Sequence, residues 1–224
     1  MISVLCPTRG RPDNVRRLVQ SAQGTATGNG YEFVFRIDAD DPAAVPGDVL
    51  VNEFVVVAAA PRARFGELWN ECAESAAGDI LMCCGDDIVF RTDGWDTAVE
   101  EAFRAWPDRI GLVYGNDMHH GANLSTHPFV HENWVRAVGY FTPPYFSHDY
   151  VDNWLFDVAG MTGRRVYLPD VVTEHMHPQA GKAAMDATYA EGAGRGGTDN
   201  VAGLYQALAG KREEDAAKLR EAMQ

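Results

Sequence analysis

The sequence predicts an α/β fold: a mostly parallel sheet flanked by helices, in a single domain with a helical C-terminal tail. Short apolar runs alternate with amphipathic stretches along the first half of the chain, which is typical of strands joined by helical crossovers. At 224 residues and 46% apolar content, the chain is long enough to bury one substantial core. Several apolar runs also end on polar residues, as strands that lead into a binding cleft do.

The first strand, 2–6, is followed by a helix that Asp13 or Asn14 caps and that runs to residue 22. Val15, Leu18 and Val19 form its apolar stripe. The next elements are expected in this order: strands 31–37 and 49–57, helix 65–77, strand 80–84, helix 95–105 and strand 110–114. The tail, 198–224, predicts one or two surface helices whose charged face is solvated.

Composition excludes several classes of protein. The net charge of −13 argues against a general nucleic-acid coat protein, which needs clustered cations. No apolar run is long enough to cross a bilayer and no signal-peptide pattern opens the sequence, so we expect a cytoplasmic protein with no membrane association. The four cysteines have no metal-ligand spacing, and the adjacent pair Cys83–Cys84 points to opposite faces of a strand, which predicts reduced core thiols. The oligomeric state is left open.

Polar side chains follow four successive apolar runs. In chain order they are Thr8 and Arg9, then Asp38, Asp40 and Asp41, then Asp86 and Asp87, then Asn116 and Asp117. The carboxyl ends of parallel strands meet at one edge of a sheet, so these groups are expected to share a cleft.

The run 80–84 enters Gly85, Asp86 and Asp87 directly, and carboxylates held at the end of a buried strand suit a divalent cation. An ordinary solvated turn is the alternative. Such cations commonly keep positions open for phosphate oxygens. A diphosphate has four candidate basic partners, namely Arg9, Arg11, Arg64 and Lys182. Neither a P-loop nor a G-x-G-x-x-G motif follows the first strand, which disfavours kinase-like and dinucleotide-binding proteins.

These motifs together resemble the GT-A (Rossmann-like) fold of nucleotide-sugar glycosyltransferases of the family 2 type. "ISVLCPTRGRP" resembles the first nucleotide-binding strand and turn, with Pro7 and Thr8, and "FRIDADD" resembles the second strand, with Asp38 at the base-recognising position. "NECAESAAGDILMCCGDD" resembles the segment that ends in the D-x-D metal motif. Asp87 then takes the metal-binding position and Asp86 the middle one, while Gly85 stands where the first acid usually does.

The second half, with "THPFVHENWVRAVGYF" and "YVDNWLFDVAGMTGRRVYLPDVVTEHMHP", is similar to small, often phage-encoded members of this group. The resemblance implies Asp152 as the base of an inverting transfer, at the start of a helix, with Asp149 as the reserve candidate on the same helical face. A first-turn Asp that complements the helix dipole is the alternative for both.

His175 and His177 lie two residues apart on an extended segment, so both rings can face the cleft. The resemblance implies that a histidine after the last core strand completes the metal shell, and imidazole favours Mn²⁺ over Mg²⁺. Sugar or acceptor contacts are expected at Asn116 and Asp117.

The resemblance implies a GT-A glycosyltransferase domain over 1–182, followed over 183–224 by a Gly-rich loop and a helical extension packed on the core. The glycines of 192–197 predict a flexible loop, with a lid over the site as the alternative.

The expected activity is metal-dependent transfer of a sugar from a nucleoside-diphosphate sugar, a UDP-sugar by preference, to a hydroxyl. A 5-hydroxymethylpyrimidine in phage DNA is the favoured acceptor. The aromatics of 140–146 are candidates to hold a flipped base or to stack on a sugar ring, with hydrophobic packing of a turn as an equally good alternative. A glycan, lipid-linked or small-molecule acceptor is the alternative. Two other classes stay open, a nucleotidyltransferase and a non-catalytic protein that binds nucleotide sugars or glycans.

Overall fold

The computed structural model describes residues 1–28, 30–52 and 54–223. In this part of the chain the strands form one sheet in the order β3-β2-β1-β4-β7-β6-β8-β5. The strands are β1 (Ile2–Thr8), β2 (Tyr31–Asp38), β3 (Val55–Ala60), β4 (Ile80–Cys83), β5 (Ile88–Phe90), β6 (Leu112–Asn116), β7 (Phe129–His131) and β8 (Arg165–His175). Most neighbours pair in parallel, whereas β7 runs antiparallel to β4 and β6, and β5 antiparallel to β8. The expected α/β fold with a mostly parallel sheet is confirmed.

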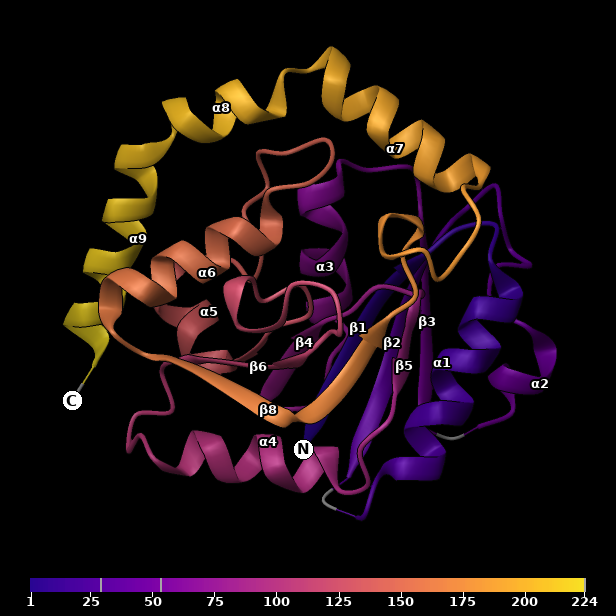
Figure 1. The fold of residues 1–224 in the computed structure, drawn as a ribbon, viewed down its shortest axis with the longest axis horizontal. Helices are drawn as coiled ribbons and strands as arrows, with labels where there is room; N and C mark the ends of the chain where they lie inside the picture. Colours follow the sequence, from indigo (N-terminus) through magenta and orange to yellow (C-terminus); the bar gives the residue numbers. More distant parts are fainter. Residues whose placement is uncertain (29, 53, 224) are drawn as a thin grey trace.

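Helices cover both faces of this curled sheet (Figure 1). They are α1 (Pro12–Thr25), α2 (Gly47–Leu50), α3 (Phe65–Ala73), α4 (Trp95–Arg104), α5 (Glu132–Val138), α6 (Val151–Thr162), α7 (Ala187–Thr198), α8 (Val201–Ala207) and α9 (Ala209–Ala222), with short 3₁₀ turns η1 (Gly121–Asn123) and η2 (Pro178–Ala180). Helices α7 to α9 form an arc that follows the rim of the molecule from the end of the sheet near β3 to the outer side of α6 (Figure 1).

The apolar core has two layers, one on each face of the sheet. One layer packs α1 and α4 against the sheet, and the other packs α3, α5, α6, α8 and α9. Alternate residues of β4 enter different layers, because successive side chains of a strand point to opposite faces. Cys83 accordingly lies in the second layer and Cys84 in the first, and both are buried free thiols, as predicted.

Two expected boundaries are wrong in ways that local chemistry explains. Helix α1 begins at Pro12 and is not capped by Asp13 or Asn14, because proline is pre-organised for the first helical position. The expected strand 49–57 begins only at Val55, since residues 47–50 form the single turn α2. Position 53 of that range lies outside the described residues.

The C-terminal region differs more. The glycines expected in a flexible loop lie in helix α7. Helix α9 was expected to expose a continuous charged face, yet Arg212 and Asp215 are buried. The carboxylate of Asp215 accepts hydrogen bonds from the Tyr140 hydroxyl and from Trp154 Nε1, which docks α9 on the core. The proposed division of the chain at residue 182 stays a prediction.

The aromatic segment 140–146 packs into the second core layer. Phe141 and Phe146 are fully buried, and Tyr140 and Tyr145 pack against the same layer. Asn70 of α3 fixes the segment by accepting the backbone N–H groups of residues 141 and 142. Of the two interpretations of this segment, the structure favours hydrophobic packing, because Phe141 and Phe146 fill the core.

None of the described helices combines the length and apolar character that a membrane crossing requires.

Candidate active site

Asp86 and Asp87 leave β4 through a glycine whose lack of a side chain is required. A Cβ added at Gly85 would lie 2.5 Å from Asp87 Oδ1 and 3.4 Å from His127 Cε1. Any larger residue would displace the Asp87 carboxylate, because real Cβ atoms do not approach other atoms so closely. The position where the D-x-D pattern usually has its first acid is thus occupied by glycine for a physical reason.

Asp86 is buried and tied to the turn after β1. Its Oδ2 accepts the Thr8 hydroxyl at 2.8 Å, and its Oδ1 lies 3.1 Å from Arg11 Nη1. Burial raises the pKa of Asp86 to about 6, the charge of Asp87 adds to the increase, and Arg11 and Thr8 oppose it. Both carboxylate oxygens are engaged, so Asp86 joins the two strand ends.

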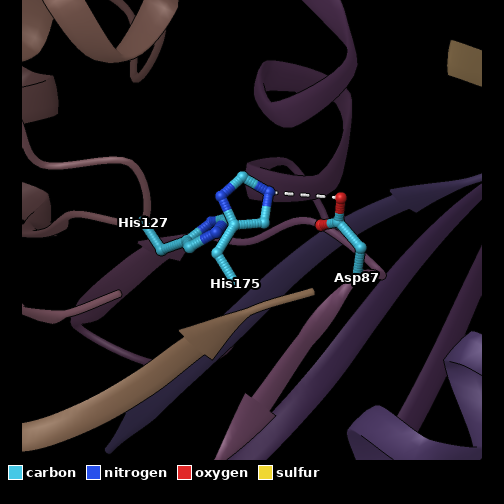
Figure 2. Close-up of side chains that lie close together, drawn as sticks. All are labelled: Asp87, His127 and His175. Carbon is cyan, nitrogen blue, oxygen red and sulfur yellow. Dashed lines mark hydrogen bonds and ion pairs between the residues drawn. The ribbon is translucent and has the colours of Figure 1, made fainter. Parts of the chain in front are cut away.

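Asp87 is buried beside two histidines. Its Oδ2 lies 3.2 Å from His175 Nε2, at the end of β8, and the ring of His127 packs edge-on against that of His175 with centroids 4.8 Å apart. Figure 2 shows the three side chains, with the ring of His175 between the other two. One ligand atom from each of the three lies within 4.8 Å of the others. Because metal–ligand bonds of this kind are about 2.1 Å long, one divalent ion nearly spans this spread.

The protonation states of Asp87 and His127 suit a metal. Burial lowers the pKa of His127 to about 3, so its ring is neutral, the form that binds metals. Burial alone would raise the pKa of Asp87, but the hydrogen bond and charge of His175 hold it well below its usual range, and Asp87 is ionised. Burial alone would lower the pKa of His175, yet the hydrogen bond and charge of Asp87 raise it above its usual value.

Two nitrogens of the cluster lack a hydrogen-bond partner in the described part of the chain, namely the buried His127 Nε2 and His175 Nδ1. Buried polar atoms are nearly always satisfied, and a missing ion is one accepted explanation for an exception. A donor set of one carboxylate oxygen and two imidazole nitrogens fits Mn²⁺ better than Mg²⁺. The residues therefore fit a divalent metal centre.

His177, expected as a second histidine ligand, lies beside the cluster. Its ring centroid is 5.0 Å from that of His175, and its Nδ1 accepts the backbone N–H of Gln179 at 3.2 Å. The structure places His127, which sequence reasoning missed, among the clustered ligand atoms. A role for His177 as a metal ligand stays a prediction.

The cluster opens into a cavity of about 290 Å³ at the carboxyl ends of β1, β2 and β4. Most of the residues expected at the site line it: Pro7, Thr8, Arg9, Arg11, Asp38, Asp86, Asp87, Asp149, Asp152, His175 and His177. Three of the four strand ends thus converge as expected.

The carboxylate of Asp38, at the end of β2, is shared by three guanidinium groups. Arg36 binds Oδ1, while Oδ2 accepts from Arg9 at 2.9 Å and lies 3.4 Å from Arg62 Nε. Arg36 is only 2% exposed and also binds Glu71 at 2.7 Å. Loss of Asp38 would leave this buried guanidinium short of a partner, so Asp38 also supports the fold. Its role in recognising a base stays a prediction.

Helix α6 starts from a strained backbone at the cavity wall. Asp149 and Tyr150 have φ of +52° and +60°, a left-handed conformation that costs a non-glycine residue roughly 1–2 kcal/mol. Asp149 therefore precedes the helix, and the expectation that it shares a helical face with Asp152 is wrong. Asp152 lies in the first turn, where its Oδ1 accepts the N–H of Asn153 at 2.9 Å. Burial raises the pKa of Asp152 to about 6.

Four expected site residues lie outside the lining of the cavity. Lys182 pairs with Glu174 at 2.9 Å, and the backbone N–H of Arg64 binds Glu67 at the start of α3. Asp117 accepts the backbone N–H groups of 119, 120 and 121, so it caps a loop, and Asn116 accepts the N–H of 118. Their roles in binding phosphate, sugar or acceptor stay predictions.

The cavity also has lining residues that the sequence did not indicate, among them Arg62, Thr126, His127, His148 and Tyr189. His127 lies two residues before β7, a three-residue strand too short to give a periodic signal. Tyr189 lies in the glycine-rich segment that was expected to be a loop. Only proximity in space reveals both residues.

The fold, a mostly parallel curled sheet flanked by helices, is similar to that of GT-A glycosyltransferases. The sequence itself matches no protein-family model and no curated protein. The likeness lies in the fold. S. aureus TarS 1–349 in complex with UDP-GlcNAc has a TM-score of 0.57 at 12% sequence identity, over 85% of this chain and 63% of that chain.

The mannosyltransferase PcManGT from Pyrobaculum calidifontis, in complex with GDP-Man and Mn²⁺, has a TM-score of 0.59 at 13% identity, over 99% of this chain and 73% of that one. A second structure of TarS 1–349 has a TM-score of 0.57 at 13% identity, over 77% of this chain and 59% of its own. This chain therefore spans about three fifths of the length of that TarS fragment.

Proposed function

We propose that the chain is a metal-dependent glycosyltransferase that moves a sugar from a nucleoside-diphosphate sugar, of the UDP type, to a hydroxyl acceptor. The buried cluster of Asp87, His127 and His175, with two unpartnered nitrogens at the carboxyl edge of a parallel sheet, carries the proposal. The bound UDP-GlcNAc of TarS and the GDP-Man and Mn²⁺ of PcManGT support it.

Donor binding is assigned to the cavity wall formed by the ends of β1, β2 and β4. Asp87, His127 and His175 would hold the metal, which when bound offsets the charge of the departing diphosphate. Arg11, which is only 10% exposed, is the first candidate to bind the diphosphate directly. Asp38 and its arginines are assigned to the nucleotide base of the donor. Pro7 and Thr8, at the end of β1, line the same cavity.

Asp152 is the proposed general base. The acceptor oxygen attacks the anomeric carbon as its proton passes to the Asp152 carboxylate, and the bond from that carbon to the diphosphate oxygen breaks, which inverts the configuration. With its pKa raised to about 6, Asp152 is ionised at neutral pH and is a stronger base than an exposed carboxylate.

A 5-hydroxymethylpyrimidine in DNA is the first acceptor to test, with a glycan, lipid-linked or small-molecule hydroxyl as the alternative. Arg62 and Arg195 at the cavity favour a polyanion, whereas the net charge of −13 opposes one. The buried aromatic segment 140–146 gives the DNA acceptor no support.

A donor screen tests the proposal. The protein is mixed with Mn²⁺ or Mg²⁺ and each of a panel of nucleotide sugars, while the melting temperature and slow donor hydrolysis are followed together. We expect one donor to stabilise the protein only when metal is present, because a ligand that binds the native state alone raises its stability, and to release a nucleoside diphosphate. Pyrophosphate release would indicate a nucleotidyltransferase instead, and saturable binding with no product would indicate a binding protein.

A further inference from the structure

Helix α7 lies over the candidate site and fills part of it. It begins near the carboxyl ends of β1 to β3, at the start of the C-terminal arc (Figure 1). Thr188, Tyr189 and Glu191, all from its first half, line the same cavity as Asp87 and Arg11. With α7 in this place the cavity measures about 290 Å³, at the lower end of the roughly 300–1,000 Å³ typical of ligand pockets.

Tyr189 occupies the space between the metal cluster and Arg11. Its hydroxyl donates to Asp87 Oδ2 at 2.6 Å, and the Arg11 guanidinium stacks on its ring at 3.8 Å from the centroid. A diphosphate that binds both a metal on Asp87 and the guanidinium of Arg11 has to lie between these two groups. The ring of Tyr189 is already there.

Acidic residues of the same segment engage the basic side chains of the site. Asp186, the residue before α7, binds Arg11 through two hydrogen bonds of 2.7 and 2.8 Å. Glu191 binds Arg62 at 2.6 Å. Carboxylates and phosphates compete for the same planar N–H donors of arginine, so these pairs must open when a diphosphate binds.

The glycines of α7 allow this close approach and also weaken the helix. A Cβ added at Gly192 would lie 2.5 Å from the ring of His148, and one at Gly196 would lie 3.3 Å from His148 Cβ, whereas Gly194 has nothing within 4 Å. Glycine is a poor helix former, so α7 depends on its contacts with the site. The helix is therefore held by the same groups that the donor requires.

We infer that the segment 186–191 is an internal competitor of the donor: Tyr189 occupies the metal ligand Asp87, and Asp186 and Glu191 occupy the arginines that bind the diphosphate. The inference rests on the proposed function and adds to it. Arg11 and Arg62 bind the donor's diphosphate, and the structure shows the state in which α7 blocks them. Metal and nucleotide together displace the segment.

Two glycine variants of the full chain test the competition. Gly192→Ala places a methyl group against His148 and loosens α7, whereas Gly194→Ala, on the open side of the same helix, is the matched control. We expect Gly192→Ala to bind UDP with Mn²⁺ about tenfold more tightly than the wild type, roughly the effect of one lost hydrogen bond to a charged group, and Gly194→Ala to bind no more tightly. Titration calorimetry measures both affinities.

A second pair of variants removes one hydroxyl each. Tyr189→Phe frees Asp87, and Tyr205→Phe removes the hydroxyl that binds Asp157, which is outside the cavity lining. We expect tighter Mn²⁺ binding for Tyr189→Phe alone, measured as the loss of free Mn²⁺ signal in electron paramagnetic resonance. Hydrogen exchange of the amides 188–197 is expected to accelerate when Mn²⁺ and UDP are added to the wild type.

The outcomes separate this inference from the proposed function. If UDP and Mn²⁺ bind but Gly192→Ala binds them equally or more weakly, or α7 becomes better protected on binding, the competition is refuted and the transferase proposal stands. If none of a panel of nucleoside diphosphates binds any variant, the proposed function fails. Mn²⁺ binding by Tyr189→Phe then still tests whether Tyr189 competes with the metal for Asp87. Equal Mn²⁺ affinity of this variant and the wild type would refute that competition.

Discussion

Gly85 lets the Asp87 carboxylate fold back beneath it, and the metal cluster depends on that contact. We expect Gly85→Ala to lower Mn²⁺ affinity by about tenfold or more, because the new Cβ would lie 2.5 Å from Asp87 Oδ1 and a shift of about 1 Å disrupts a metal site. Mn²⁺ titration by electron paramagnetic resonance measures the loss. Gly24→Ala, where nothing lies within 4 Å, should leave the affinity unchanged. Equal affinities for the two variants would show that Asp87 is not a ligand.

Mutation can show whether His127 or His177 is the metal ligand that accompanies Asp87 and His175. His127→Ala should reduce Mn²⁺ affinity by about tenfold to a hundredfold, since it removes a buried nitrogen that no other described group satisfies. His177→Ala should have a smaller effect, because its Nδ1 already accepts a backbone N–H. A larger loss of affinity for His177→Ala than for His127→Ala would support His177 as the ligand, as expected from the sequence. The same titration serves both variants.

Asp152 should give both activity and stability a dependence on pH. Its pKa is raised to about 6 by burial, so transfer should rise as pH increases through 6 and then level off. Asp152→Asn should reduce transfer by about a thousandfold and leave donor binding intact, as expected for loss of a general base. Transfer rates between pH 5 and 8, with donor affinity measured separately, check this. Near-normal transfer by the variant would exclude Asp152 as the base.

The stability effect of Asp152 has the opposite sign. Its pKa is higher in the folded state than the usual value of about 4, so the folded protein loses stability as the pH rises from 4 to 6 and the carboxyl ionises. At pH 7.5 we expect Asp152→Asn to melt about 2–4 °C higher than the wild type. The difference should shrink below pH 6. A lower melting temperature for the variant at pH 7.5 would contradict a buried, destabilising charge.

Residue identity and strand position indicated Asp87, and the family resemblance added His175 and Asp152, whose role as base stays a prediction. Asp87 follows the strongest apolar run, His175 ends a long strand, and Asp152 opens an apolar helix. His127 gave no comparable signal, because the strand that follows it, β7, has only three residues and is positioned by antiparallel pairing with β4 and β6. Long-range pairing of this kind is not encoded locally.

At the scale of elements, α9 is attached to the core through a buried carboxylate. Asp215 accepts hydrogen bonds from the Tyr140 hydroxyl and from Trp154 Nε1, so Asp215→Ala leaves two buried donors unsatisfied. We expect the free energy of unfolding to fall by about 3 kcal/mol. Urea denaturation measures it, with Glu213→Ala on the exposed side of α9 as the control. A change of less than about 0.5 kcal/mol for both variants would show that α9 is held by apolar packing alone.

The elements predicted best are those with a strong apolar period, such as α1 and α4. Helix α7 could not be predicted, because four of its residues are glycines and its stability comes from tertiary contacts with the site. The burial of Arg212 and Asp215 on α9 was missed for a related reason. A charged residue in a sequence is expected to be solvated unless its buried partners are known. The partners here are Tyr140, Trp154 and Tyr205.

For the whole molecule, the negative charge makes salt an informative variable. If DNA carries the acceptor, contacts between phosphates and the arginines at the cavity should make transfer fall by about tenfold or more between 50 and 200 mM salt. Transfer to a neutral glycan should stay constant over that range. Steady-state rates with each acceptor at several salt concentrations distinguish a DNA acceptor from a neutral glycan. Constant rates with a DNA acceptor would show that ion pairs between arginines and phosphates do not contribute to transfer.

The layered architecture itself followed from the order of apolar runs, since alternating strands and helices have few ways to pack. The antiparallel insertion of β7 and the return of β8 to pair with β5 did not follow, because three-residue strands have no period of their own. These two features bring His127 and His175 to Asp87.

The adjacent thiols of Cys83, at the end of β4, and Cys84, directly after it, provide two reporters at one point of the chain. Cys83 faces the layer under α3, α5 and α6, where it also lines the cavity, and Cys84 faces the layer under α1 and α4; both are buried. Single-cysteine versions of the protein, pulsed with a thiol reagent during unfolding, would therefore record when each side of the sheet opens to solvent. If one thiol reacts well before its neighbour, the helices on that side separate first, and simultaneous reaction would mean that the sheet is uncovered in a single step.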